Sequence, residues 1–196
     1  EEGGKGKRLW DKAQVGQLRS VVRRRLADSF EPEEVQGLAE EEQLLYGILE
    51  GVICKGRSDS CLLVGSHGSG KSLILRRAWR RAAAAAEAAG ECARLVTLHG
   101  SLHGEARAAS QELLRLLPSG KEEEGGGAGL GSLEEEVAEL QRRLQGSSGT
   151  VLVLEEMDLF ACRNGQAAGG GGQQSVLYLL FDLLHLETLR LAIVGV

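Results

Sequence analysis

The chain has 196 residues, of which 42% are hydrophobic and 26% are charged, and this suits one soluble α/β domain with a core of its own. Its net charge of -5 excludes a general attraction of the whole chain to nucleic acid, although the first thirty residues hold eight Lys or Arg against four Asp or Glu. It has no apolar run near the roughly 18 residues of a membrane helix and no signal-peptide layout, so we expect an intracellular protein.

The predicted elements begin with a helix over 14–28 that ends before Pro32. Its apolar residues recur at helical spacing and predict a helix packed through one stripe, which consists of Val15, Leu18, Val22 and Leu26. Three consecutive arginines, Arg23 to Arg25, suit contacts with DNA phosphates or a solvated helix face.

A second apolar-periodic stretch predicts a helix over 38–53. The short apolar run 61–64 then predicts a strand buried on both faces, with Cys61 in the core. A glycine-rich octet follows this strand directly, and the helix-forming residues of 72–89 come next. Strand, loop and helix therefore stand in the order that a phosphate-binding loop requires.

Predicted strands and predicted helices continue to alternate along the rest of the chain. Apolar runs predict strands over 94–99, 151–154 and 190–196, and helical spacing predicts helices over 105–117 and 175–185. A further helix opens at Ser132, where Ser132 and Glu135 have capping-box spacing. Strands that alternate with helices predict a parallel sheet with right-handed crossovers.

Composition sets the expected domain organisation. We expect a disordered basic tail over 1–13 and a nucleotide-binding domain over 14–196. Glycine occurs 28 times, about twice its usual share. Much of it lies near 120–131 and 165–173, which predicts two flexible insertions.

Four cysteines without C-x-x-C spacing favour a reducing compartment. Met157 is the only methionine and the chain stops on an apolar run, so we expect both ends to be cut.

The octet carries the clearest chemistry. It consists of Gly65, Ser66, His67, Gly68, Ser69, Gly70, Lys71 and Ser72. Glycines let successive backbone N–H groups turn toward phosphate oxygens at the positive end of the following helix. We expect Lys71 to reach the β and γ phosphates of ATP and the Ser72 hydroxyl to ligate Mg²⁺. His67 occupies a variable position, where we expect a solvated or phosphate-adjacent side chain rather than a base.

An acidic pair follows the buried run 151–154. Carboxylates at the end of such a strand can hold the water shell of a metal and orient an attacking water. Glu155 is the candidate Mg²⁺ ligand and Glu156 the candidate catalytic residue. Because Glu is one methylene longer than the Asp usual at the first position, we expect weak or no ATP hydrolysis. The alternative is a pair of surface acids at the end of a strand.

Other phosphate-loop classes fit less well. None of the five aspartates has a glycine three residues later, as the GTPase D-x-x-G segment requires, and the only Asn, Asn164, precedes Gly165. A small-molecule kinase needs an Arg-bearing lid, and the candidate segment 161–174 offers only Arg163 amid glycines. GTPase is disfavoured, and a kinase stays open.

Taken together, these motifs resemble the initiator branch of the AAA+ ATPases. The resemblance covers roughly 17–196 apart from the glycine-rich insertions. Residues 58–65 with 68–72 look like the Walker A block of that branch, and 155–161 look like its Walker B block with an Asp-Leu-Phe extension. Residues 175–182 and 192–196 resemble its next helix and strand.

This resemblance implies a RecA-like αβα core and a place among the subunits of the origin recognition complex. Such a subunit binds replication origins with ATP and Mg²⁺, as part of a hetero-oligomeric ring in the nucleus. In this family the sensor, arginine finger, lid and winged-helix domain lie further along, so we expect a fragment that stops before them. DNA contacts are then expected chiefly from regions outside this chain.

Two other functions remain open. The chain can belong to a stand-alone phosphate-loop enzyme, either an ATPase of another type or a small-molecule kinase. It can also be a degenerate domain that only scaffolds.

Overall fold

The computed structural model describes residues 11–25, 35, 37–118, 132–145, 149–162, 176–186 and 188–196. The chain divides into unit 1, Glu1–Gln36, and unit 2, Gly37–Val196. Both predicted glycine-rich insertions, near 120–131 and 165–173, lie outside the described residues, as do the first ten residues of the predicted tail.

Unit 1 contains helix α1, Lys12–Arg25. The predicted helix is confirmed over 14–25, and 26–28 lie outside the described residues. The described residues of unit 1 do not show the expected packing of its apolar stripe, because Leu18 and Val22 are 54% and 45% exposed. The described residues of this unit include no second helix or strand against which the stripe could pack.

Unit 2 is built on a parallel sheet, as the alternation predicts. Its strands are β1 (Asp59–Leu62), β2 (Arg94–His99), β3 (Thr150–Glu155) and β4 (Leu191–Gly195). They lie in the order β1-β4-β3-β2, and every neighbouring pair is parallel. All four carboxyl ends therefore meet at one edge of the sheet.

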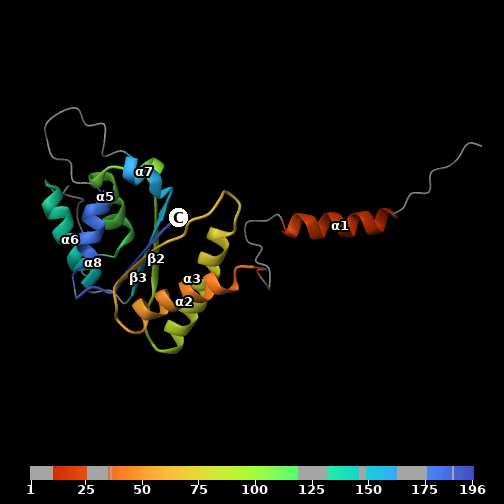
Figure 1. Ribbon diagram of the computed structural model, residues 1–196, viewed down its shortest axis with the longest axis horizontal. Coiled ribbons are helices and arrows are strands. Elements are labelled where there is room, and N and C mark those ends of the chain that lie inside the picture. The colour runs from red at the N-terminus through yellow and green to blue at the C-terminus, as the bar shows by residue number, and fades with distance from the viewer. Residues whose placement is uncertain are drawn as a thin grey trace, which may run out of the picture. The chain divides into compact units, whose positions relative to one another are not determined.

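Helices cover both faces of this sheet (Figure 1). Helices α2 (Ala39–Ile53) and α3 (Lys71–Ala88) pack together on one face. Helices α5 (Ala106–Leu116), α6 (Leu133–Gln145) and α8 (Val176–Leu184) lie on the other. Short helices α4 (Gly100–His103) and α7 (Met157–Cys162), which the sequence patterns do not predict, contact each other. No helix in the described part of the chain is long and apolar enough to cross a membrane.

The two central strands are buried on both sides, which explains their unbroken apolar runs. Leu152, Leu154 and Ile193 belong to the core beneath α5, α6 and α8. The alternate residues Val153 and Val194 are also at most 2% exposed, on the face that α2 and α3 cover. Two covered faces are what parallel sheets require.

The first strand, β1, differs from the prediction in both its bounds and its burial. It spans Asp59–Leu62 rather than 61–64, and it is not buried on both faces, since Leu62 and Val64 are 56% and 83% exposed. The reason is its place in the described sheet, where β1 pairs with β4 alone. Pairing continues for one residue past the strand, because the amide of Leu63 donates to the Gly195 carbonyl at 2.8 Å.

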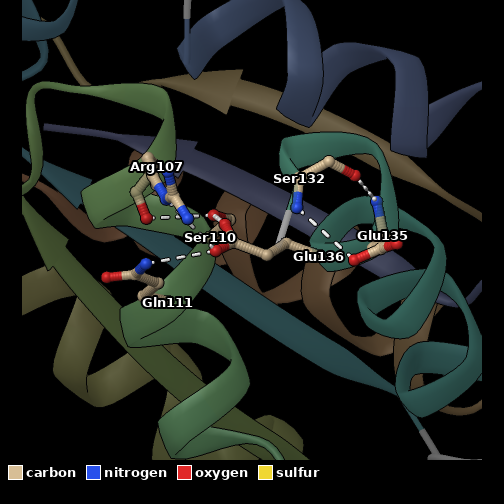
Figure 2. Close-up of polar contacts among 6 residues, drawn as sticks. All are labelled: Arg107, Ser110, Gln111, Ser132, Glu135 and Glu136. Carbon is tan, nitrogen blue, oxygen red and sulfur yellow. Dashed lines mark hydrogen bonds and ion pairs between the residues drawn. The ribbon is translucent and has the colours of Figure 1, made fainter. Parts of the chain in front are cut away.

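A buried polar network joins α5 to α6 (Figure 2). The carboxylate of Glu136, only 2% exposed, accepts hydrogen bonds from the Ser110 hydroxyl and the Gln111 amide, and Arg107 lies 3.6 Å away. Next to it the predicted capping box is confirmed, because the Glu135 amide donates to Ser132 Oγ at 3.2 Å and the Ser132 amide to Glu135 Oε2 at 3.4 Å.

The two neighbouring glutamates of α6 should differ in their effect on stability. Glu136→Ala removes the buried acceptor of two donors, so we expect it to lower the free energy of unfolding by about 2–3 kcal/mol. Glu135→Ala removes only one half of an exposed cap and should cost about 0.5–1 kcal/mol. Urea unfolding followed by circular dichroism measures both, and equal losses would contradict the network's role.

Candidate functional site

The predicted phosphate-binding octet lies between the end of β1 and the first turn of α3. Gly68 and Gly70 adopt positive φ values of 77° and 94°, which only glycine takes without strain. Gly70 is the residue immediately before α3, whose first residue is Lys71. The octet thus places backbone amides at the positive end of an 18-residue helix.

The side chain of Lys71 folds back over this loop. Its ammonium donates hydrogen bonds to the carbonyl oxygens of Gly65, at 2.8 Å, and Ser66, at 3.0 Å. The loop itself is closed by the amide of Ser69, which donates to the Ser66 carbonyl at 3.2 Å. Lys71, the residue predicted to bind phosphate, is therefore held at the centre of the turn.

A cleft of about 1210 Å³ brings the predicted site residues together. Every member of the octet except Ser66 lines it, and so do Glu155 and Glu156. Ser72, the predicted partner of Glu155 in metal binding, thus opens onto the same cleft. His67 is exposed on its wall. The loop and the acids are 83 or more residues apart in the chain, and the common edge of the parallel sheet joins them.

The two acids stand at the end of β3 but differ in backbone conformation and in partners. Glu155 ends the strand, and its Oε2 lies 3.1 Å from Nδ1 of His99. Glu156 comes next with a φ of 57°, a left-handed conformation that costs a non-glycine residue about 1–2 kcal/mol. Its Oε2 accepts a hydrogen bond from the amide of Ser101 at 3.2 Å. Both carboxylates therefore have partners at the end of β2 or just after it.

Sequence reasoning missed this segment, His99 to Ser101. Gly100 lies so close to α7 that a Cβ there would meet the Glu156 carbonyl oxygen at 2.5 Å and Leu159 Cβ at 2.9 Å. His99 stands opposite Glu155 in the parallel register of β2 and β3. The two strands are far apart in sequence, so only the strand order could have revealed the contact.

Helix α2 packs against α3, the helix that follows the loop, and holds it in place. Glu42 of α2 is 7% exposed, and its carboxylate accepts hydrogen bonds from Arg77 at 2.8 Å and from Arg81 at 3.3 Å. Leu38, just before α2, reaches the loop, because its Cδ1 would lie 2.8 Å from a Cβ on Gly70. The helix that follows the loop is thus fixed to its neighbour by buried charge.

Cys61 lies on β1, the strand that leads into the loop. The thiol is half-buried rather than part of the core, and its burial, with a smaller contribution from Asp59, raises its pKa to about 11. A thiol with so high a pKa is mostly protonated near neutral pH, so it is a poor nucleophile.

The donor set fits a nucleotide with its magnesium ion. The octet offers amides, the Lys71 ammonium and the hydroxyls of Ser69 and Ser72, and the facing acids offer carboxylates. Within the described ranges, no three His, Cys, Asp or Glu side chains form a group that could hold a metal by themselves. Mg²⁺ that is bound with a nucleotide takes one or two ligands from the protein and the rest from phosphates and water.

Comparison with known proteins agrees with this geometry. The model of the family described as "AAA ATPase domain" matches residues 34–194. Among curated proteins, the chain is 27% identical to origin recognition complex subunit 4 of Rattus norvegicus, over 92% of this chain and 40% of that protein. It is 29% identical to the Xenopus laevis subunit 4, over 81% of this chain and 35% of that protein. The chain spans about two fifths of the length of these relatives.

Solved structures show the same fold. A structure of Drosophila ORC bound to DNA matches 100% of this chain and 47% of its own, with a TM-score of 0.68 and 22% identity. The Aeropyrum pernix ORC1 protein in complex with DNA matches 88% of this chain and 42% of its own, with a TM-score of 0.64 and 22% identity.

The close approach at Gly100 makes a direct prediction. Gly100→Ala forces a methyl group against the Glu156 backbone, so we expect the free energy of unfolding to fall by about 1–3 kcal/mol. Gly47→Ala is the matched control, because Gly47 is exposed inside α2 with open space around it. That change should raise stability by up to about 1 kcal/mol. Denaturant titration of both variants checks the prediction, which is wrong if Gly100→Ala is neutral.

Proposed function

The chain belongs to the AAA ATPase domain family, and we propose that it is the nucleotide-binding core of an origin recognition complex subunit. In this proposal it binds ATP and Mg²⁺ in the cleft between the octet and the acids. Bound ATP then stabilises contacts with other subunits of a hetero-oligomeric ring at replication origins. The observation that carries the proposal is the cleft itself, where a glycine-rich loop with a centred lysine faces two strand-end carboxylates.

The chain's own groups have distinct tasks in this proposal. The amides of the octet and the ammonium of Lys71 hold the phosphates, and Lys71 exchanges the carbonyls of Gly65 and Ser66 for phosphate oxygens. Ser72 and Glu155 hold the magnesium ion, which neutralises phosphate charge when bound. Glu156 orients an attacking water.

Slow turnover is part of the proposal. The Glu156 carboxylate accepts a hydrogen bond from the Ser101 amide, and the Glu155 carboxylate lies against His99. One carboxylate oxygen of Glu156 is thus already engaged by a backbone donor, which leaves it fewer acceptor positions for orienting a water. The extra methylene of Glu155 over Asp would also change where Mg²⁺ is held. We therefore expect ATP to act mainly as a ligand.

The relatives support the choice of biological setting. The origin recognition complex subunits 4 of two vertebrates align over most of this chain, and the structurally similar Drosophila assembly is bound to DNA. On this basis we propose that the full-length protein works in the nucleus with other complex subunits. It would bind origin DNA in an ATP-dependent manner, chiefly through regions outside this chain.

Nucleotide binding can be tested through stability. ATP with Mg²⁺ at about 100 times its Kd should stabilise the protein by about 2.7 kcal/mol, seen as a rise of several degrees in Tm by scanning fluorimetry. Lys71→Ala should abolish this rise. Lys55→Ala, which removes a surface lysine paired with Glu50 at 2.6 Å, should retain it. A Tm that ATP leaves unchanged in the unmodified protein would favour a purely scaffolding domain.

Assembly tests the complex itself. The full-length protein should co-purify with the other origin recognition complex subunits of the same organism in ATP, and Lys71→Ala should weaken that assembly. Steady phosphate release or acceptor phosphorylation by the protein alone, lost on Lys71→Ala, would instead favour a stand-alone ATPase or a small-molecule kinase.

A further inference from the structure

Helix α1 has a composition unlike the rest of the chain. Its 14 residues, Lys12–Arg25, contain five Lys or Arg and no Asp or Glu, whereas the whole chain has a net charge of -5. Its basic residues are Lys12, Arg19, Arg23, Arg24 and Arg25. The nucleotide site uses none of them.

The exposed surface of α1 combines apolar and basic side chains. Leu18, Val21 and Val22 are 54%, 48% and 45% exposed, and their spacing of three and four residues places them on one helix face. Arg19 and Arg23 line a hollow of about 330 Å³ together with Leu18 and Val22. Leu18 and Val22, here called the apolar ledge, therefore lie directly beside the guanidinium groups of Arg19 and Arg23.

This helix needs a packing partner. Isolated helices of about 12–15 residues are marginal in water even when their sequence favours helix. Helix α1 also contains Gly16 and three valines, which lower its intrinsic helix propensity. Unit 1 provides no other helix or strand among its described residues. A surface that stabilises α1 by packing against its apolar side would bury Leu18 and Val22.

We propose that α1 is a docking helix that lays this ledge into an apolar groove rimmed by carboxylates on a neighbouring subunit. The inference rests on the proposed function, because that assembly supplies the neighbour. An amphipathic helix in a groove anchors through residues at such spacings, and the arginines beside the ledge pair with acidic groups at the rim. A nucleic acid backbone would match the arginines but would leave Leu18 and Val22 in water.

Photo-crosslinking in the reconstituted full-length complex tests the contact. The photoreactive residue p-benzoylphenylalanine replaces Leu18 in one sample and Ser20 in another, since Ser20 is exposed and lies roughly 160° around the helix from Leu18. We expect position 18 to crosslink to one other subunit and position 20 not to do so. Crosslinks from position 18 only to residues 37–196 of its own chain, or to added duplex DNA, would overturn the inference, as would equal yields from both positions.

Affinity provides the second measurement. Leu18→Asp should weaken binding of the full-length chain to the remaining subunits roughly tenfold or more, because a buried apolar side chain becomes charged. Ser20→Asp should leave that affinity unchanged, and both variants should keep the wild-type ATP-dependent rise in Tm. An unchanged affinity in Leu18→Asp overturns the docking role alone. If the wild-type chain does not join the complex at all, the proposed function fails and this inference fails with it.

Discussion

The common direction of the four strands is the constraint on which the site depends. Because β1, β4, β3 and β2 are all parallel, their carboxyl ends meet at one edge, and whatever follows each strand is delivered there. The octet follows β1, Glu155 and Glu156 stand at the end of β3, and His99 to Ser101 stand at the end of β2. A parallel sheet in turn needs both faces covered, so helices α2, α3, α5, α6 and α8 are required for the site to form.

Within that frame, close backbone approach determines where the acids lie. Gly100 lets α4 begin against the Glu156 carbonyl, and Glu156 takes a left-handed conformation at the same point. The Ser101 amide then meets the Glu156 carboxylate. The backbone strain at Glu156 and the lack of a Cβ at Gly100 therefore belong to one arrangement. The surrounding contacts of this arrangement explain how Glu156, which is not a glycine, keeps a positive φ beside the cleft.

Local patterns predicted the elements well, because each depends on neighbouring residues. The capping box at Ser132 is one such case, and the unbroken run 151–154 is another, since it becomes a strand covered on both faces. The apolar run at β1 looked the same but belongs to a strand paired on one side only. Strand order, the contact of His99 with Glu155 and the clash at Gly100 depend on residues distant in the chain, and no local pattern contains them.

The position of Lys71 affects the energetics of the cleft. Its ammonium already donates to two carbonyl oxygens of its own loop, so a bound phosphate must compete with acceptors that are in place. Binding is then an exchange of neutral acceptors for charged ones, and only the difference between the two sets contributes to affinity. Since that difference is largely charge with charge, ionic strength should act on the strength of nucleotide binding more than on the fold of the loop.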